Sequence, residues 1–344
     1  MPPLADRVVV TGAHGWIGDR VGAALRERGR QVIGVSRDPE AARADRPEWD
    51  WIGTGDELDD AVAAAGAVVN LAGRNVFEQR WTSEYVEVMR RSRVDVTHRV
   101  VRALARHGRP GVLVSASGFT VCGDAGDVEL PDDTPPSRDL VLGDVYADWE
   151  HAARAADPAI RAVVARIGVV LGPAHGALDF FRRPFLERRG AVLGSGEQWV
   201  PWVHVDDVVA LLVEALEDPR YRGVVHVVAP HPVRHRELAV RLAESAGTSC
   251  EAVEPAESVR ERLGPAAEMI LTSQRMVPRR ALELGYEFRH PDLAGAIADL
   301  VGRRRTSSDV TESPVNGDFV RVDAANSAFV AYRRASPSGR LARS

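Results

Sequence analysis

The chain has 344 residues, of which 45% are hydrophobic and 27% charged, enough apolar residues for one large core or a core with an attached second lobe. Its formal net charge is −5, which excludes a general basic field that would attract nucleic acid or an anionic membrane surface. The two cysteines, Cys122 and Cys250, are too few for a disulfide scaffold and show no CxxC metal-binding spacing.

These features favour small-molecule chemistry in a reducing compartment. The N-terminal residues run into a strand pattern without a basic segment and an apolar signal region, and no apolar run approaches the ~20 residues of a membrane span. We therefore expect a soluble, cytoplasmic protein that binds no metal, no nucleic acid and no membrane. All 44 basic residues are arginine, which excludes any mechanism that needs a lysine amine.

The apolar pattern alternates between short strands and helices up to Gly172. In chain order, strands are expected at residues 8–10, 31–35, 49–52, 67–71, 112–116 and 161–167, with another at 224–228. Helices are expected through residues 21–25 and at 39–43, 56–65, 84–106, 145–156, 206–216, 235–246 and 291–301. Strands that alternate with helices predict an α/β fold with a Rossmann-type doubly wound parallel sheet.

The pattern also suggests how the chain is divided. Residues 1–171 form the predicted dinucleotide-binding Rossmann domain, to which residues 203–230 return. Residues 172–202 and 231–301 form a smaller C-terminal substrate lobe. Residues 302–344 are rich in Ser, Asn and Arg and are expected to be a mobile tail, although two short apolar clusters at 319–322 and 329–332 offer a way for part of it to dock.

Three glycines follow the first strand and precede the first helix. This pattern gives a tight turn, a close backbone approach to a pyrophosphate and close helix packing, with the helix N-terminus facing the phosphates. The predicted cofactor contacts in this turn are Gly12, His14, Gly15, Trp16, Ile17 and Gly18.

The end of the second strand indicates which dinucleotide binds. NAD-binding proteins place an acid there for the ribose 2′-hydroxyl, whereas NADP-binding proteins place an arginine near the 2′-phosphate. This chain has Ser36 and Arg37 at that point, and both favour NADP(H). The alternative is that Arg37 is only solvated, while Asp38 caps the following helix.

The fourth strand leads from Asn70 into Leu71, Ala72 and Gly73, of which the last two are small. Ligands of open α/β sheets bind at the carboxyl edge of the strands, where this turn is expected to lie. Small residues let a cofactor pass close to the backbone, so we predict that these three contact it. An ordinary glycine turn is the alternative.

Several further segments carry a family resemblance. They are Asn-Leu-Ala-Gly at 70–73, Arg-Trp-Thr at 80–82, Ser-Arg at 92–93, Cys-Gly-Asp at 122–124, Asp-Trp-Glu at 148–150, Arg-Ile-Gly-Val-Val-Leu-Gly at 166–172, Gly-Ser-Gly at 194–196, Trp-Val-His-Val-Asp-Asp at 202–207 and Ser-Gln-Arg-Met-Val-Pro at 273–278. Together they resemble the extended short-chain dehydrogenase/reductase superfamily. More narrowly, they resemble its atypical epimerase-like branch, often labelled sugar-nucleotide epimerase or SulA-like cell-division inhibitor.

That superfamily usually carries a Ser, an acid/base Tyr and a Lys four residues later, which holds the nicotinamide ribose and lowers the Tyr pKa. A lysine-free chain cannot complete this triad. If Glu150 matches the glutamate that commonly follows the motif, Tyr146 falls on the lysine position and Leu142 on the tyrosine position. A shift of one helical turn instead makes Tyr146 the tyrosine. Both registers stay open, with Tyr146 as the candidate acid/base and Ser117 as the candidate substrate-binding hydroxyl.

The resemblance implies further contacts. Cofactor contacts are expected from Ser115, Arg166, Gly168 and Val169, and substrate contacts from Arg80, Trp81, Cys122, Trp202 and His204. In extended members the motif around His204 usually anchors the second lobe, which is the competing interpretation of that residue. The branch often has Gly-Tyr-Tyr-Gly-Asp after its fifth strand, but residues 120–124 here lack both tyrosines.

Three functions are compatible with these features. The first is an NADP(H)-dependent oxidoreductase acting on a small carbonyl, hydroxyl or activated alkene. The second is an isomerase, epimerase or cyclase with a retained or structural cofactor, and the third is a non-catalytic dinucleotide-binding protein. A Ser/His/Asp hydrolase is excluded because no GxSxG turn is present. The extended relatives also imply a homodimer through the helix at 84–106 and the helix near Tyr146.

Overall fold

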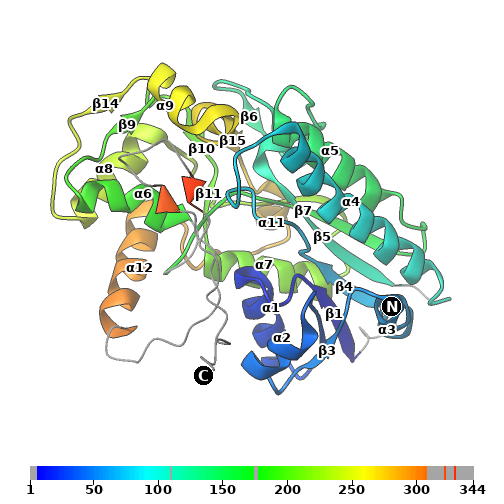
Figure 1. The fold of residues 1–344 in the computed structure, drawn as a ribbon. Helices are drawn as coiled ribbons and strands as arrows, with labels where there is room; N and C mark the ends of the chain where they lie inside the picture. Colours follow the sequence, from blue (N-terminus) through cyan, green and yellow to red (C-terminus); the bar gives the residue numbers. More distant parts are fainter. Residues whose placement is uncertain (1–5, 109–110, 174–176, 308–320, 323–328, 331–344) are drawn as a thin grey trace, which may run out of the picture.

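The computed structural model describes residues 6–108, 111–173, 177–307, 321–322 and 329–330. A seven-stranded sheet with the order β12-β7-β5-β4-β1-β2-β3 forms its centre, and every adjacent pair is parallel (Figure 1). Its strands are β1 (Arg7–Thr11), β2 (Gln31–Val35), β3 (Asp50–Ile52), β4 (Ala67–Asn70), β5 (Val112–Gly118), β7 (Arg161–Ile167) and β12 (Gly223–Val227). The predicted Rossmann-type α/β fold is therefore confirmed.

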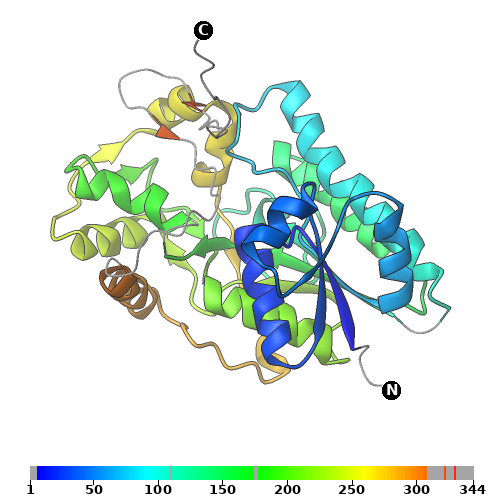
Figure 2. The ribbon, with the colours of Figure 1, turned by 60° about the horizontal axis from the view of Figure 1, so that its bottom comes forward.

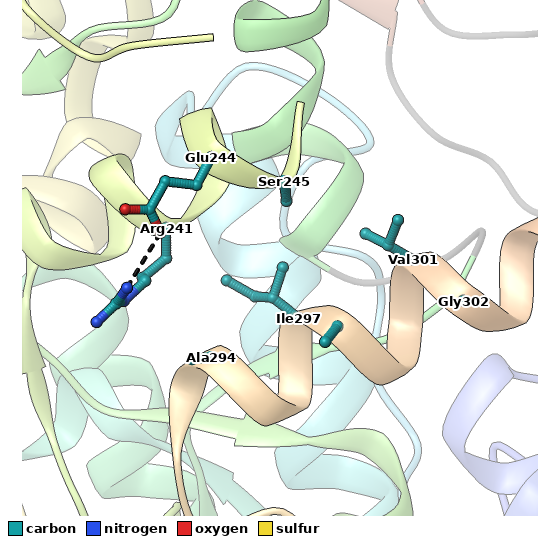
Figure 3. A pocket seen from close by; sticks show the side chains of 8 residues that line it. Arg241, Glu244, Ser245, Ala294, Ile297, Val301 and Gly302 are labelled. Carbon is teal, nitrogen blue, oxygen red and sulfur yellow. Dashed lines mark hydrogen bonds and ion pairs between the residues drawn. The ribbon is translucent and has the colours of Figure 1, made fainter. Parts of the chain in front are cut away.

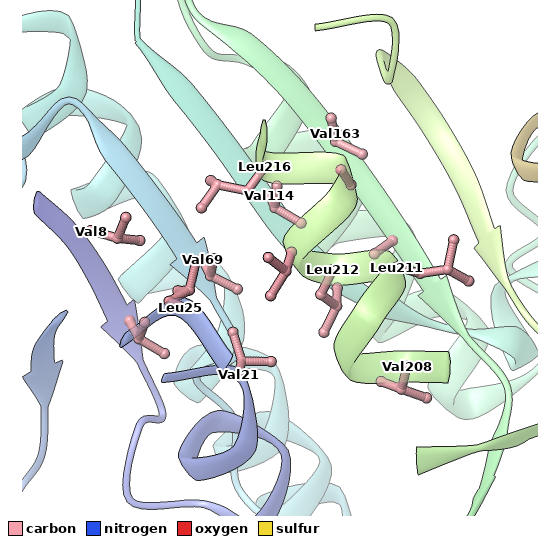
Figure 4. Close-up of a cluster of buried hydrophobic side chains, with 14 of the residues drawn as sticks. Val8, Val21, Leu25, Val69, Val114, Val163, Val208, Leu211, Leu212 and Leu216 are labelled. Atoms are coloured by element: carbon pink, nitrogen blue, oxygen red, sulfur yellow. The ribbon is translucent and has the colours of Figure 1, made fainter. Parts of the chain in front are cut away.

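Helices cover both faces of this sheet, which is why its central strands are mostly apolar. One face carries α1 (Trp16–Glu27) and α7 (Val205–Glu217). Their side chains meet those of the strands in one buried cluster, to which Leu25 of α1 and Leu212 and Leu216 of α7 belong (Figure 4). The other face is covered by α3 (Asp56–Ala65), α4 (Ser83–Ala105) and α5 (Val141–Arg154), while α2 (Pro39–Asp45) packs beside β3.

The lobe after β8 (Val169–Leu171) has an apolar core of its own, with Trp202 fully buried in it. Its helices are α6 (Ala177–Leu186), α8 (His235–Ser245), α9 (Ala256–Leu263), α10 (Glu268–Leu271) and α12 (Leu293–Ser307), and α11 (Arg279–Glu283) contacts β12. Short strand pairs join its loops, namely β10 (Trp199–Val200) with β13 (Val233–Arg234), β9 (Val192–Leu193) with β14 (Val253–Glu254), and β11 (Trp202–His204) with β8. The lobe lies beside the β7 and β5 end of the sheet (Figures 1 and 2).

Two predicted helix boundaries are wrong by about a turn or more. Helix α5 begins at Val141, one turn before the predicted start at residue 145. Helix α12 continues to Ser307 instead of ending at residue 301, and Arg303 within it forms ion pairs with Asp206 and Asp299. The predicted tail therefore cannot begin at residue 302.

The rest of the tail prediction mostly lies outside the described residues. Of residues 308–344, the structure describes only the two-residue strands β16 (Arg321–Val322) and β17 (Phe329–Val330), which pair antiparallel. No helix within the described ranges is long and apolar enough to cross a membrane.

Candidate functional site

The glycine turn after β1 is tightly packed at its two ends and exposed in its middle. Gly12 has a φ of +66°, and a Cβ there would lie 2.6 Å from the Leu71 carbonyl oxygen. A Cβ at Gly18 would lie only 2.2 Å from the Gly12 oxygen, so this glycine permits close helix packing. Gly15 is exposed, and a Cβ there would meet only that same Gly12 oxygen, at 3.0 Å. The turn thus has the shape in which backbone amides approach a phosphate closely.

Helix α1 begins at this turn without a side-chain cap, because Gly15 is its N-cap residue. Its first backbone N–H groups therefore remain available to an anion. Trp16 and Ile17 are half-buried in the first turn, where the Arg20 guanidinium carbon lies 5.2 Å from the centre of the Trp16 ring. His14 contacts Asp45 of α2 through Nε2 at 2.8 Å, which ties the glycine turn to the segment after β2.

The turn after β4 lies directly beside the glycine turn. The Thr11 hydroxyl oxygen accepts hydrogen bonds from the backbone N–H groups of Leu71 and Ala72, both at 3.2 Å. Gly73 is exposed next to them. The structure thus brings two groups of predicted cofactor residues, distant in sequence, to one edge of the sheet.

At the end of β2, Asp38 caps α2 by accepting a hydrogen bond from the Ala41 N–H at 3.0 Å. This is the helix cap that the sequence offered as an alternative role for this segment. Ser36 is buried and its hydroxyl bonds to the Asp38 backbone. Arg37 is exposed, and within the described part of the chain its guanidinium has neither an ion pair nor a hydrogen bond. Its positive charge is therefore free to meet a ligand.

A buried polar network lies under this edge. Asn70 accepts a hydrogen bond from the Thr11 hydroxyl at 2.6 Å and donates to the Thr97 and Ser115 hydroxyls at 2.8 and 3.2 Å. Ser115 is fully buried, so the predicted cofactor contact through its side chain is wrong. Its hydroxyl instead satisfies Asn70, which holds β1, β4 and β5 in register.

A second network corrects two more predictions. The Ser117 hydroxyl donates to Glu150 Oε1 at 2.9 Å, and Arg166 donates to the two Glu150 oxygens at 2.7 and 2.9 Å. Arg166 is completely buried and Ser117 nearly so. Burial acts to lower the pKa of Arg166, but the hydrogen bonds and charge of Glu150 outweigh it and raise that pKa. Neither Ser117 as substrate contact nor Arg166 as cofactor contact is therefore supported.

Cys122 also belongs to this interior. Its Sγ lies 3.6 Å from Arg166 Nη1, which also donates to the Thr134 carbonyl at 2.7 Å. Burial raises the pKa of the Cys122 thiol to about 11, although the Arg166 charge works in the opposite direction. The thiol is thus protonated, which does not fit a nucleophile, and its substrate contact stays a prediction. Both cysteines are free.

Tyr146 lies at the end of β5. Its ring occupies the space where Gly118 would carry a side chain, because a Cβ there would lie 2.3 Å from Tyr146 Cε2. Leu142, one turn earlier on α5, is fully buried among apolar residues, and Glu150, one turn later, is bound to Arg166. Of the residues at these three helical positions, Tyr146 is the one whose side chain reaches the end of β5 with a proton to donate.

Sequence reasoning missed Glu268. Its carboxylate accepts hydrogen bonds from the Val141 and Leu142 backbone N–H groups, both at 2.9 Å, and so caps α5 from the lobe. Burial raises the pKa of this carboxyl, while the two backbone hydrogen bonds act to lower it. No local sequence pattern distinguishes Glu268 from the other acids of the lobe.

The predicted substrate residues separate into two groups. Arg80 is exposed, and Trp81 is buried with its indole N–H donating to the Val76 carbonyl at 2.6 Å. They lie on the loop between β4 and α4, whose Phe77 ring stacks on Phe180 of α6 at 6.1 Å. This loop therefore lies where the lobe meets the sheet edge, and both residues stay predictions as substrate contacts.

Trp202 and His204 are fully buried, so the predicted substrate contacts there are wrong. The Trp202 indole donates to the His231 carbonyl at 3.0 Å. His204 Nδ1 accepts from the Asp206 N–H, which leaves the proton on Nε2, 3.3 Å from Asp299 of α12. His204 thus anchors the lobe. His204, His290 and Asp299 lie close enough to hold a metal ion, but this protonation of Nε2 does not fit a ligand role.

Gly168 and Val169 link β7 to β8. A Cβ at Gly168 would lie 2.0 Å from the Pro201 carbonyl oxygen, so packing already explains this glycine. Val169 is half-buried and donates its N–H to the same oxygen at 2.7 Å. Their cofactor contacts stay predictions.

A groove of about 320 Å³ lies elsewhere, between α8 and α12 of the lobe (Figure 3). Its lining includes Ser245, Ile297 and Val301, together with the ion-paired Arg241 and Glu244. None of the predicted cofactor or catalytic residues lines it. The convergence of the two turns and Tyr146 identifies the carboxyl edge of the sheet, and not this groove, as the candidate site.

Comparison with known proteins supports this choice. A family model described as "NAD dependent epimerase/dehydratase family" matches residues 8–228, and a "Domain of unknown function (DUF1731)" matches residues 255–300. The first match covers the sheet, the glycine turn and Tyr146. The chain therefore belongs to the NAD-dependent epimerase/dehydratase family.

Within that family, the chain is similar to proteins named "Epimerase family protein SDR39U1". The chloroplastic homologue of Arabidopsis thaliana is 35% identical over 84% of this chain and 85% of its own, and the protein of Mus musculus is 33% identical over 86% and 99%. The crystal structure of human SDR39U1 (isoform 2) with NADPH has a TM-score of 0.76 and 30% identity, covering 86% and 99% of the two chains. MoeE5 in complex with UDP-glucose and NAD has a TM-score of 0.69 and 25% identity over 88% and 99%.

The buried ion pair gives a first testable prediction. Replacing Glu150→Gln should lower the free energy of unfolding by about 3–5 kcal/mol, because Arg166 would then keep its charge in the interior without a counter-charge. Arg154→Ala is the matched control: it removes the half-exposed third partner of Glu150 and should cost below about 1 kcal/mol. Urea unfolding followed by circular dichroism measures both, and equal losses would contradict the assignment.

Proposed function

We propose that the protein is an NADP(H)-dependent oxidoreductase that acts on a small carbonyl compound, hydroxyl compound or activated alkene. The observation that carries the proposal is the convergence at one sheet edge of a glycine turn exposed at Gly15, the guanidinium of Arg37, which has no partner among the described residues, and the phenol of Tyr146. When bound, the dinucleotide supplies or accepts the hydride, and the protein supplies binding, orientation and a proton.

The residues fit such a cofactor. The exposed Gly15 leaves room beside the backbone for a pyrophosphate, and the uncapped N-terminus of α1 offers hydrogen-bond donors and a positive dipole end. Ala72 and Gly73, which carry little or no side chain, leave room for the rest of the dinucleotide along the edge. Arg37 is placed to meet the 2′-phosphate with charge-assisted hydrogen bonds.

Tyr146 is the proposed proton donor to the substrate oxygen or carbon. Its place against Gly118 at the end of β5 supports this role, because the reacting end of the cofactor is expected near the end of that strand in the family. Ser117 takes no direct part in this proposal, because its hydroxyl is bound to Glu150. It supports Tyr146 by fixing α5 on the sheet.

An isomerase or epimerase with a retained cofactor is the second candidate. The family description and solved neighbours such as MoeE5, crystallised with UDP-glucose and NAD, favour it. In such a reaction the hydride removed from the substrate returns to it, so no net consumption of NADPH is expected. The cytoplasmic location and the homodimer through α4 and α5 also remain proposals.

Cofactor preference is tested by titrating NADPH and NADH into the wild type and Arg37→Ala. We expect the substitution to weaken NADPH binding about ten- to a hundredfold, which corresponds to roughly 1.5–3 kcal/mol for a charge-assisted contact, and to leave NADH binding unchanged. Arg43→Ala is the control, since Arg43 lies on the next helix and bonds to the Trp51 carbonyl. Equal affinities of the wild type for both cofactors would contradict the proposal.

The reaction type is tested by following NADPH absorbance with panels of aldehydes, ketones, quinones and enones. We expect repeated turnover with at least one class, and a fall in kcat of about a hundredfold or more in Tyr146→Phe with unchanged NADPH affinity. Tyr221→Phe, which removes a phenol on the opposite face of the sheet, should leave kcat unchanged.

Native mass spectrometry of the purified protein separates the second candidate. A stoichiometric dinucleotide that survives purification, with no NADPH consumption from any panel, would favour the isomerase over the oxidoreductase. Loss of NADPH absorbance in many turnovers would exclude a purely structural cofactor.

A further inference from the structure

Arg93, in the middle of α4, is a buried cation without a carboxylate. The residue is only 7% exposed. Its Nη1 donates to the Met89 carbonyl at 3.0 Å and its Nη2 to the Arg74 carbonyl at 2.9 Å. Its Nε is buried and has no hydrogen-bond partner, and no acid within the described residues forms an ion pair with it.

This environment differs from that of the other buried arginines. Arg166 is neutralised by Glu150, and Arg161 is surrounded by three carbonyls, of Ala215, Leu216 and Tyr221, at the end of α7. Burying a charge without a counter-charge is costly, so such a group is expected where its field has a use.

The guanidinium faces the candidate site. Its Cζ lies 5.7 Å from the centre of the Tyr146 ring and 5.3 Å from that of Trp149. A Cβ at Gly73 would lie 2.9 Å from the same carbon. Arg93 therefore lies between the turn after β4, which the cofactor is proposed to follow, and the phenol proposed to donate the proton.

Few other charges face Tyr146. From α10, Glu268 contributes a negative charge, and on α5 itself Glu150 is neutralised by Arg166 of β7. The strand β5 contributes only Gly118 and the neutral Ser117. One turn before Arg93 on α4, Arg90 faces α5 and is paired with Asp144 and Asp148.

We propose that Arg93 is a positioning residue that holds a permanent positive charge against the Tyr146 phenol, the electrostatic role that a lysine on α5 has in relatives with a complete triad. The proposal rests on the function proposed above, in which Tyr146 donates the proton. Burial raises the pKa of Tyr146, whereas the charge of Arg93 acts to lower that pKa.

An arginine in the place of a lysine has a chemical consequence. An arginine keeps its charge throughout the accessible pH range, whereas a buried lysine can lose its proton. The acidity of Tyr146 would then not change through any titration of Arg93.

The test measures the pKa of Tyr146 directly, in the full chain without cofactor or substrate. The five tyrosines are replaced biosynthetically by a fluorinated tyrosine with a more acidic phenol, and ¹⁹F NMR follows each resonance against pH. Tyr146→Phe identifies the resonance. We expect Arg93→Met and Arg93→Gln to raise this pKa by about 1–3 units, and Arg93→Lys to keep it near the wild-type value.

Arg90→Met is the matched control, because it removes a charge from the same helix and the same interface without facing the phenol. It should leave the Tyr146 pKa unchanged. An unchanged pKa in a folded Arg93→Met or Arg93→Gln protein would overturn the proposal. So would loss of folding in both uncharged variants while Arg93→Lys folds with a shifted pKa. A failure to consume NADPH would count against the proposed function but would leave this titration valid.

Discussion

The ion pair between Glu150 and Arg166 is the constraint on which the candidate site depends. Neither side chain is accessible to water, so neither charge is tolerable there without the other. Glu150 fixes α5 against β5 through Ser117, while Arg166 holds the segment after η1 (Phe119–Cys122) through Thr134. Because Tyr146 is one turn from Glu150 on the same helix, the position of the phenol at the sheet edge follows from this buried contact.

The glycine turn was predictable because its requirements are local. A positive φ at Gly12 and tight packing at Gly18 depend on residues a few positions away, and the pattern states both. Polar residues at strand ends were not predictable in the same way. Ser115 and Ser117 precede the open edge, but their partners lie far away in sequence: the Ser115 hydroxyl accepts from Asn70, and the Ser117 hydroxyl donates to Glu150, 33 residues later. Sequence reasoning placed the serines at the right strand and gave them the wrong partners.

The position of Arg93 on the apolar face of α4 could be recognised in the sequence as unusual, but the many other arginines obscured it. Arg93 is four residues after Met89 and four before Thr97, on the same buried face of α4. A cation on the apolar stripe of an amphipathic helix is unusual enough to indicate a function. Glu268 had no such signal, since its role as the cap of α5 depends on a contact between segments 126 residues apart. The end of α12 was missed because arginines continue a helix as readily as they begin a polar tail.

The order of the strands in the sheet also determines which apolar surfaces stay uncovered while the chain is being synthesised. Edge strand β12 and helix α7 come from residues 205–227, yet α7 packs against α1 near the N-terminus. Until about 200 residues have left the ribosome, the apolar face of β1, β4 and β5 that carries Val8, Val69 and Val114 has only α1 to cover it. The nascent chain therefore exposes an apolar sheet face for most of its translation, at the stage when chaperones bind such surfaces.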